Sequence, residues 1–402
     1  MTLSEELRWR EQIKDKTFEN LSFLDEPKTF YLGVDCSSNS MTIGNLAVFM
    51  LARRLLDNGW KTVLLVGGAT SLIGDPGGKE DERDLKSREE IQANVAAIKS
   101  QVERLFSGQC FTLVDNYDWF KDIGYLEFLR DVGKHYSMSE LIARDYITAR
   151  MGEGGRGISY AEFSYSLIQG YDFWHLYKEH GVVMQIGGSD QWGNMLSGVP
   201  LVRKKENAEV HALSAPLVIN KATNKKFGKS EDGAVWLDEE LTSVYKFYQF
   251  WLNADDEGVI DYMKIYTLLD RLTIEELVDQ QASDPSKRVA QKILAYEVTK
   301  LVHGEARAEQ ARNVTAALFG DTPFDQLLDE EIDMLAREIP VSASGNLVNA
   351  LVTSGVCASN GEARRLLAGN AISINGEKVS EDCELKVPSL IKKGKNTFIL
   401  VR

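Results

Sequence analysis

Two short apolar segments on either side of an amphipathic one most constrain the fold of this chain. Residues 29–34 and 62–66 have the length and the β-branched and aromatic content of buried strands, whereas 46–56 has the apolar periodicity of a helix. This order predicts a βαβ unit with parallel strands. Further strands at 111–114 and 182–186, with helical stretches between them, extend the prediction to an α/β fold with a doubly wound, Rossmann-like parallel sheet.

Glycine and polar residues follow three of the predicted strands. They form the strings GVD at 33–35, GGAT at 67–70 and GGSD at 187–190. Ligands bind at the carboxyl ends of the strands in a doubly wound sheet, and glycine lets the backbone approach a nucleotide closely. An ordinary βα turn explains any one of these strings but poorly explains all of them together. The pattern therefore predicts a nucleotide site at this edge of the sheet.

Lysines surround a Phe-Gly turn in the segment 221–230, KATNKKFGKS. Ammonium groups on a glycine-containing loop can follow negative charge as it moves from a bridging oxygen to departing pyrophosphate. Taken alone, such a segment is more often a solvated surface turn. Its occurrence together with the glycine-containing strand ends favours a loop that acts on a triphosphate.

Composition and charge agree with a soluble globular protein. The 402 residues are 44% hydrophobic and 26% charged, which suits two or three domains. The N-terminus is charged and no apolar run approaches the ~20 residues of a membrane span, so we expect a cytoplasmic protein without a membrane partner. The net charge of −14 does not exclude RNA, because binding depends on local potential and 341–402 carries eight basic against five acidic side chains.

Neither the cysteines nor the histidines indicate a metal site. The cysteines are far apart and show no C-x-x-C spacing, and the five histidines show no metal-ligand spacing. We therefore predict reduced thiols and no metal held by the protein itself.

Several strings in order along the chain resemble the bacterial-type tyrosyl-tRNA synthetases. KFGKS at 226–230 takes the place of the "KMSKS" loop of class I synthetases, TIGN at 42–45 that of "HIGH", and GGSDQWGN at 187–194 also matches. The resemblance runs almost from end to end. One departure is sharp, because Thr42 and Asn45 stand where the family has histidines.

The resemblance implies a tyrosine–tRNA ligase with several domains. We expect a Rossmann-like catalytic domain at 1–235, a helical anticodon-side domain at 236–325, a linker at 326–342 and a small α+β S4-like RNA-binding domain at 343–402. In the last of these, Arg364 and Arg365 match residues that contact RNA.

The implied activity has two steps. Tyrosine and ATP, with Mg²⁺, give tyrosyl-adenylate and pyrophosphate, and the tyrosyl group then passes to the terminal adenosine of tRNA(Tyr) for translation. The resemblance also implies a homodimer. Two alternatives stay open: a paralogous tyrosyl synthetase that serves a secondary pathway or antibiotic resistance, and an RNA-binding homologue that has lost catalysis.

A helix expected around 159–177 carries part of the implied tyrosine pocket. Tyr165, Gln169 and Asp172 fall at i, i+4 and i+7 and so share one face. On spacing alone such a polar face is usually just solvated, but the family places the matching residues in the amino-acid pocket. The implied tyrosine-binding residues are Tyr31, Thr70, Asp75, Asn116, Tyr165, Gln169, Asp172 and Gln191.

The resemblance also implies residues for ATP and for the transition state. The ATP-binding residues are Gly33, Asp35, Ser37, Gly44, Gly188, Asp190, Lys226, Phe227, Gly228 and Lys229. The catalytic residues are Thr42, Asn45, Lys79, Arg83, Lys226, Lys229 and Ser230. The attacking tyrosine carboxylate is already an anion, so no general base is required.

Overall fold

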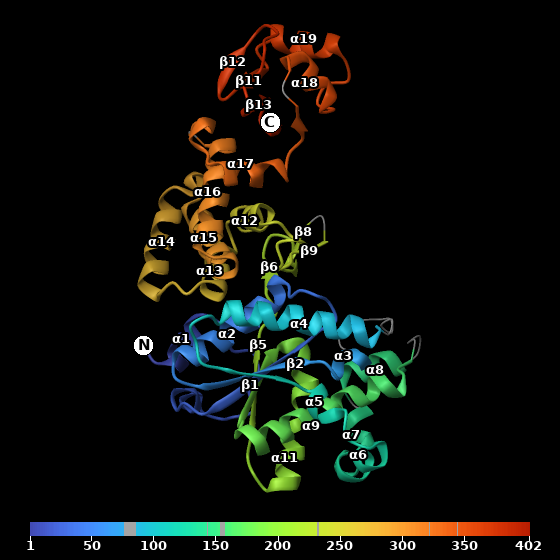
Figure 1. The fold of residues 1–402 in the computed structure, drawn as a ribbon. Coiled ribbons are helices and arrows are strands. Elements are labelled where there is room, and N and C mark those ends of the chain that lie inside the picture. The colour runs from blue at the N-terminus through green and yellow to red at the C-terminus, as the bar shows by residue number, and fades with distance from the viewer. Residues whose placement is uncertain (76–85, 143, 153–156, 231–232, 321, 344) are drawn as a thin grey trace. The chain divides into compact units, whose positions relative to one another are not determined.

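The chain divides into two compact units. The computed structural model describes residues 1–75, 86–142, 144–152, 157–230, 233–320, 322–343 and 345–402. Residues 1–242 and 254–290 form the first unit, and residues 243–253 and 291–402 form the second (Figure 1). The domain boundaries expected at 235, 325 and 342 stay predictions.

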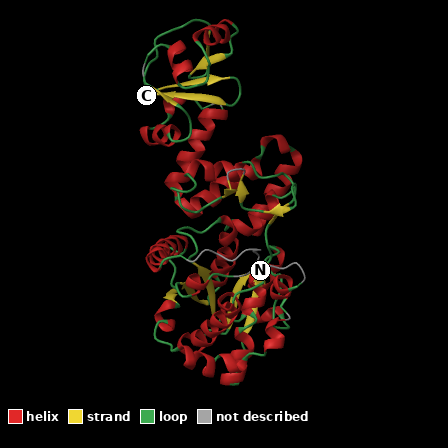
Figure 2. Cartoon of the chain, turned by 90° about the vertical axis from the view of Figure 1, so that its right-hand side faces the viewer, coloured by secondary structure: helices red, strands yellow, loops and turns green. Residues whose placement is uncertain are grey.

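A five-stranded parallel sheet organises the first unit. Its strands stand in the order β3-β2-β1-β4-β5 and all run in parallel. Their bounds are β1 Thr29–Asp35, β2 Lys61–Gly67, β3 Thr112–Asp115, β4 Met184–Gly188 and β5 His211–Ala215. The predicted doubly wound fold is confirmed, and Figure 2 shows the yellow strands of the sheet between red helices.

The expected strand at 182–186 begins before β4, for a local reason. The Val182 amide donates to the Leu176 carbonyl and closes the end of the preceding helix, α9 (Tyr160–His180). The apolar run is thus shared between a helix end and a strand. The hydrophobic pattern of the sequence does not distinguish the end of the helix from the start of the strand.

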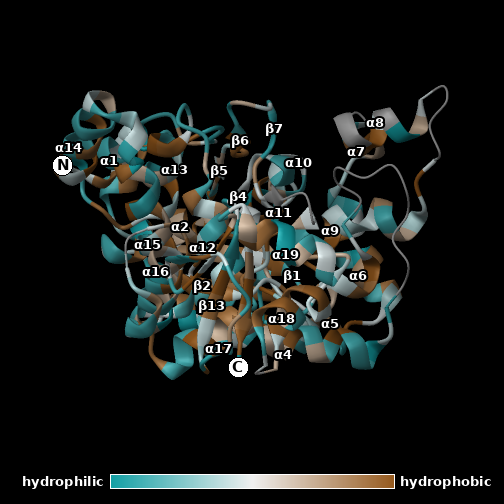
Figure 3. Cartoon of the chain, turned by 90° about the horizontal axis from the view of Figure 1, so that it is seen from above, coloured by the Kyte–Doolittle hydropathy of each residue, from teal (hydrophilic) through white to brown (hydrophobic). Residues whose placement is uncertain are grey.

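Helices cover the sheet. Those of the first unit are α1 Leu3–Trp9, α2 Ile43–Asp57, α3 Thr70–Ile73, α4 Arg88–Leu105, α5 Tyr117–Phe120, α6 Tyr125–Asp131, α7 Met138–Ile142, α8 Asp145–Met151, α9, α10 Trp192–Met195, α11 Gly198–Glu206, α13 Val259–Tyr266 and α14 Arg271–Ser283. Short 3-10 turns are η1 Leu21–Asp25, η2 Gly133–His135, η3 Ser189–Gln191 and η4 Pro285–Lys287. Figure 3 shows hydrophobic colour in the strands and hydrophilic colour on outer helical turns.

The long helices begin and end at recognisable signals. Ser159 and Glu162 form a capping box at the start of α9, and Gly181 ends that helix with φ of 64°. Gly198 lets α11 approach α9, since a Cβ atom there would lie 2.6 Å from the Phe173 Cβ atom. These signals hold α9 against the sheet, where Phe173 and Leu176 pack with Tyr31 and Val63.

Short strands carry the lysine-rich segment. They are β6 Ile219–Asn220 paired with β7 Lys225–Lys226, and β8 Lys229–Ser230 paired with β9 Gly233–Ala234. The segment 235–237 then runs beside the start of α2, because the Ile43 amide donates to the Val235 carbonyl and the Leu237 amide donates to the Met41 carbonyl.

The second unit joins a helical region to a small mixed sheet. Its helices are α12 Val244–Leu252, α15 Val289–His303, α16 Glu305–Phe319, α17 Asp329–Ala336, α18 Leu347–Thr353 and α19 Asn360–Ala368, with the 3-10 turn η5 Phe324–Gln326. The sheet order is β10-β14-β13-β11-β12, with bounds β10 Val341–Ser342, β11 Ile372–Ile374, β12 Glu377–Val379, β13 Ser389–Lys393 and β14 Thr397–Val401. α18 and α19 bury Leu351 and Leu367 in a core with Ile391 and Ile399 of this sheet. The predicted small α+β domain is confirmed.

No helix in the described parts of the chain is both long and apolar enough to cross a membrane.

Candidate active site

Polar residues gather where the strand order of the sheet reverses. β1 and β4 are neighbours there, and the crevice outside their carboxyl ends is the usual ligand site of a doubly wound sheet. Gly33 is exposed although β1 is the middle strand of the sheet. The backbone at the centre of the sheet is therefore open on this side.

Asp35 holds the centre of this edge. Its carboxylate accepts hydrogen bonds from the Tyr165 hydroxyl at 2.7 Å and the Thr70 hydroxyl at 2.8 Å. Gly67 makes room for this cluster, since a Cβ atom there would lie 2.2 Å from the Thr70 Oγ1 atom and 2.6 Å from the Asp35 Oδ1 atom. The glycine at the end of β2 thus admits neighbouring side chains, which the sequence pattern did not reveal.

Asp172 is a buried carboxyl group held by neutral donors. The Asn116 side-chain amide donates to it at 3.1 Å and the Trp119 indole N–H at 3.0 Å. The side chain is 1% exposed, and burial raises the pKa of its carboxyl group to about 8, although both donors act in the opposite direction. Asn116 is itself fixed, because its Oδ1 atom accepts from the Ala69 amide at 2.7 Å.

The Tyr31 hydroxyl is buried without a hydrogen-bond partner in the described part of the chain. Burial raises the pKa of Tyr31 well above its ordinary value, and the charge of Asp172 acts in the same direction. The ring packs against Phe173 with centroids 5.3 Å apart. An unpartnered hydroxyl within electrostatic range of a buried carboxyl group can take part in binding a further hydroxyl, which both donates and accepts.

Asp75 is the third carboxyl group described at this edge of the sheet. It accepts from the Gln191 side-chain amide at 2.6 Å and from the Asn194 amide at 3.2 Å. Burial first, and then the charges of Asp35 and Asp75, raise the pKa of Tyr165 well above its ordinary value. The Tyr165 hydroxyl therefore lies in the field of both carboxylates.

Two of these partners, Trp119 and Asn194, were absent from the residues predicted for the site. Each lies three positions after a predicted residue, Asn116 or Gln191, on a short helical turn. This spacing of three residues was the sequence signal that could have identified Trp119 and Asn194.

Thr42 and Asn45 bind each other at the start of α2. The Asn45 Oδ1 atom accepts from the Thr42 backbone amide at 2.9 Å and from the Thr42 hydroxyl at 3.0 Å. Asn45 is exposed, whereas Thr42 is half buried. Gly44 lies between them, and a Cβ atom there would meet the Thr42 Oγ1 atom at an ordinary 3.4 Å.

The lysine-rich segment reaches the same edge of the sheet. The Lys226 Nζ atom lies 3.2 Å from the Asp190 Oδ2 atom, and both side chains are about half exposed. Phe227 is buried at 6% exposure. Gly228 has φ of 109°, and a Cβ atom there would lie 3.0 Å from the Ile43 Cγ1 atom. This segment therefore lies against the start of α2.

The other predicted residues are spread around this edge. Gln169 is half buried on α9, Ser37 is exposed just after β1, and Gly188 ends β4. Lys229 and Ser230 form β8, whereas Lys79 and Arg83 lie outside the described residues.

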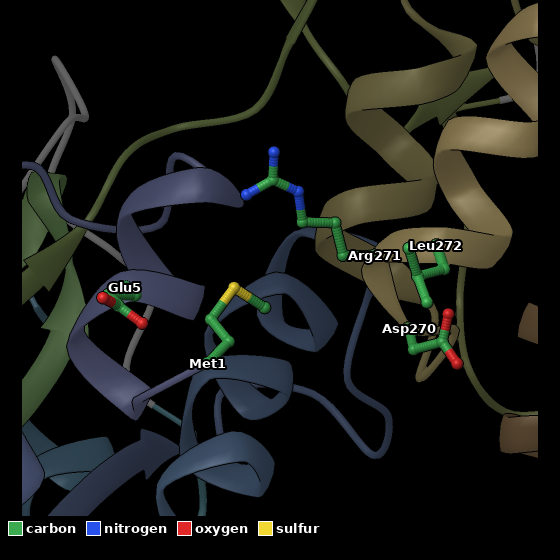
Figure 4. Close-up of a pocket in the computed structure, with 5 residues that line it drawn as sticks. All are labelled: Met1, Glu5, Asp270, Arg271 and Leu272. Carbon is green, nitrogen blue, oxygen red and sulfur yellow. The ribbon is translucent and has the colours of Figure 1, made fainter.

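A separate hollow of about 620 Å³ contains none of the predicted residues. Figure 4 shows Met1 and Glu5 on one side of it and Asp270, Arg271 and Leu272 on the other. Among the described residues, no group of three or more Asp, Glu, His or Cys side chains could hold a metal ion.

Comparisons with known proteins agree with this geometry. The family model described as tRNA synthetases class I (W and Y) matches residues 24–320, and that of the tyrosine–tRNA ligase SYY-like C-terminal domain matches residues 331–402. A tyrosine–tRNA ligase of Listeria monocytogenes is 42% identical over 415 residues, covering 100% of this chain and 97% of its own. Tyrosine–tRNA ligase 2 of Bacillus cereus is 42% identical over 423 residues, covering 100% of both chains.

A solved structure shows the same fold. The C-terminally truncated mitochondrial tyrosyl-tRNA synthetase of Aspergillus nidulans is 31% identical, with a TM-score of 0.70, covering 77% of this chain and 92% of its own. The parallel sheet and the matched family model are those of a class I aminoacyl-tRNA synthetase. Within that class, the chain belongs to the tyrosine–tRNA ligase family, which confirms the resemblance.

Asp172 should give the substrate-free protein a measurable pH dependence. A carboxyl group whose pKa is raised on folding contributes stability that is complete below its ordinary pKa of about 3.9 and is lost as pH rises through its folded value. With a folded pKa of about 8, Asp172 should destabilise the wild type relative to Asp172→Asn as pH rises from about 5 to 8. Urea unfolding at both pH values measures this difference.

Asp270→Asn is the matched control. That carboxyl group is exposed and its pKa is lowered, chiefly by the Thr273 backbone amide, so its contribution should not change across this pH window. A constant difference between wild type and Asp172→Asn would mean that Asp172 is already ionised in the folded protein at the lower pH.

Proposed function

We propose that the pocket at the carboxyl ends of β1 and β4 performs the tyrosine–tRNA ligase reaction. It joins L-tyrosine and ATP into tyrosyl-adenylate with release of pyrophosphate, and then transfers tyrosine to the terminal adenosine of tRNA(Tyr) for translation in the cytoplasm. The unpartnered hydroxyl of Tyr31, within range of the Asp172 carboxyl group, is the observation that carries this proposal. A phenol hydroxyl can donate to the carboxylate and accept from Tyr31.

The opposite end of the substrate needs negative charge for its ammonium group. Asp75 is the proposed partner, held in place by Gln191 and Asn194. Tyr165 and Gln169, on the same face of α9, extend this end of the pocket, and Thr70 holds Asp35 beside them, while Asn116 holds Asp172 at the hydroxyl end. The charges of Asp35 and Asp75, which both raise the pKa of Tyr165, support this assignment, because a nearby carboxylate favours a cation.

The nucleotide then lies over the exposed backbone of Gly33. Asp190 is the proposed ligand of the ribose, and Asp35, Ser37, Gly44 and Gly188 complete the surface. Mg²⁺ would enter with ATP and be held by phosphate oxygens, since that ion keeps most of its ligands from substrate and water.

In the activation step the tyrosine carboxylate attacks the α-phosphate of ATP. The bond to the bridging oxygen breaks and pyrophosphate departs with its electron pair. Lys226 and Lys229 are proposed to stabilise this developing charge, with Ser230, Thr42 and Asn45 as polar donors. Lys79 and Arg83 are proposed for the pyrophosphate on the family resemblance alone.

Two alternatives have distinct signatures. A paralogue with a secondary role would catalyse tyrosine-dependent pyrophosphate exchange but charge bulk tRNA poorly. A homologue that only binds RNA would catalyse no exchange.

Tyr31→Phe should weaken the discrimination between tyrosine and phenylalanine. The substitution removes one hydrogen-bonding group that phenylalanine leaves unpaired, so the ratio of kcat/KM values should fall by about tenfold, the worth of one ordinary hydrogen bond. ATP–pyrophosphate exchange with each amino acid measures the ratio. Tyr177→Phe, which changes another tyrosine packed on the same core, should leave it unchanged. Equal activation of both amino acids by the unmodified protein would contradict the pocket.

The small α+β domain is proposed to bind tRNA through Arg364 and Arg365. Both side chains are exposed on α19, whose other face buries Ala363 and Leu367 in the core. Replacing both arginines by alanine should weaken tRNA charging. It should also reduce the slope of log affinity for tRNA against log salt concentration by an amount that corresponds to about two phosphate contacts. Pyrophosphate exchange should be unaffected. The Arg-to-Lys pair, which keeps the charge, should retain most of the salt slope; equal slopes for all three proteins would exclude this RNA contact.

We also propose that two copies associate through α6 to α9. This region exposes large apolar side chains, namely Tyr125, Leu126, Met138, Ile142, Met151 and Tyr160, while the same helices bury a common cluster with Leu141 and Ile147. An exposed apolar surface of this kind favours a protein partner, and a second copy is the simplest symmetric one.

Leu126→Glu should convert the dimer to a monomer. Leu126 is 79% exposed, so the substitution places a charge in the proposed interface without disturbing the fold. Sedimentation at micromolar concentration measures the mass. Leu272→Glu is a matched control, because Leu272 is 72% exposed on a different helix and should leave the mass unchanged. A wild-type protein with the mass of one chain would refute the dimer.

A further inference from the structure

The segment that bears the active-site lysines is fastened to a helix outside the predicted site. α13 contacts it at two points. The Lys221 ammonium group forms an ion pair with Asp261, and the Phe227 ring stacks on Tyr262 with centroids 4.1 Å apart and planes at 23°. Tyr266, one turn further along α13, adds a second ring at 6.1 Å.

Phe227 is an anchor by its burial. It is 6% exposed, although its neighbour Lys226 is about half exposed, and the Phe227 amide donates to the Val218 carbonyl at 2.8 Å. Tyr262 is 1% exposed, so the stack is closed to water. Stacked rings at this separation attract each other beyond the effect of burial alone. The buried Phe227 ring therefore holds in place the backbone next to Lys226.

Tyr262 is itself held from both ends. Its hydroxyl donates to the Asp255 carboxylate at 2.8 Å. Gly258 must be small, since a Cβ atom there would lie 2.5 Å from the Tyr262 Cζ atom. The ring has little freedom to move within α13.

Two buried arginines fix the end of α13. The Arg54 guanidinium donates to the carbonyls of Ile265 at 3.1 Å and Thr267 at 2.7 Å, and that of Arg10 donates to the carbonyls of Lys264 at 2.8 Å and Leu269 at 2.7 Å. These bonds satisfy carbonyls that the end of a helix leaves free. Arg54 belongs to α2, which begins beside Thr42 and Asn45. α13, which contacts the lysine-bearing segment, is thus bonded to the helix whose first turn contains Asn45.

We propose that Tyr262 is a positioning residue for tyrosine activation: it holds Phe227 and thereby sets where Lys226 stands relative to the nucleotide. The inference rests on the proposed roles of Lys226 and ATP. A displacement of about 1 Å in a catalytic group can cost on the order of a hundredfold in rate, so a side chain without substrate contact can affect the chemical step.

Tyr262→Leu removes the stack and keeps the position apolar. It should raise the rate of tryptic cleavage after Lys226 by about tenfold and lower the single-turnover rate of tyrosyl-adenylate formation by roughly 10- to 100-fold, with the tyrosine dissociation constant unchanged. Tyr262→Phe keeps the ring and loses only the hydroxyl, so it should restore both values to within about twofold of wild type. Lys226→Ala in the unmodified background gives the rate expected when the ammonium group is absent.

A double-mutant cycle separates positioning from general destabilisation. If Tyr262 acts through Phe227, the variant with both residues changed to leucine should be no slower than the slower single variant. Tyr248→Leu, the same change at a buried tyrosine of the second unit, should leave cleavage after Lys226 and the rate unchanged. Additive losses in the cycle, or a loss in Tyr248→Leu equal to that in Tyr262→Leu, would overturn the proposal.

The remaining outcomes are also decisive. Should Tyr262→Leu fail to fold, Phe227→Leu removes the same stack from the other side and must show the same cleavage and the same loss of rate. Unchanged cleavage in a folded Tyr262→Leu would refute the anchor. Absence of tyrosine-dependent exchange in the wild type would instead refute the proposed function, while the cleavage rates would still test the anchor.

Discussion

The site depends on keeping several carboxylates at one edge of a parallel sheet. Asp35 takes hydroxyl donors, Asp75 takes amide donors, and Asp172 takes an amide and an indole N–H. Hydrogen bonds of this kind satisfy the carboxyl oxygens, while burial raises the pKa of Asp172 to about 8. The charges of Asp35 and Asp75 reach Tyr165 and give this edge a negative potential, which suits the ammonium group proposed to bind beside Asp75.

The same potential makes ATP difficult to bind in the next part of the crevice. A triphosphate beside these carboxylates needs positive charge from elsewhere, and Lys226 on the segment after β5 is its proposed source. Before the nucleotide arrives, Lys226 lies against Asp190, the proposed ribose ligand. An exposed pair of this kind is worth little on its own, so ATP can displace it at low cost. In the proposed site, the lysines on this outer segment separate the charge that ATP needs from the tyrosine pocket.

Much of the fold was predictable because its signals are local. Alternating strands and helices predicted the parallel sheet, which is confirmed, whereas the site at the carboxyl ends of the strands stays a prediction. The features that the sequence did not predict depend on contacts between residues that are far apart in the chain. Trp119 meets Asp172 only because β3 and α9 come together, and Gly67 is required by the packing of Thr70 on Asp35. The role of α13 was equally hidden, since no pattern in 259–266 distinguishes a platform for Phe227 from an ordinary buried helix face.

The start of α2 shows how the departure from the family motif can be tolerated. A threonine hydroxyl has one proton, and in the free protein Thr42 donates it to the Asn45 Oδ1 atom. Thr42 can therefore offer that proton to a phosphate only by giving up this bond. Asn45 needs no such change, because its oxygen accepts from Thr42 and an amide N–H₂ group has two donors of its own. The proposed donor role thus costs Thr42 its bond to Asn45, whereas Asn45 could donate from its amide N–H₂ group while that bond stays intact.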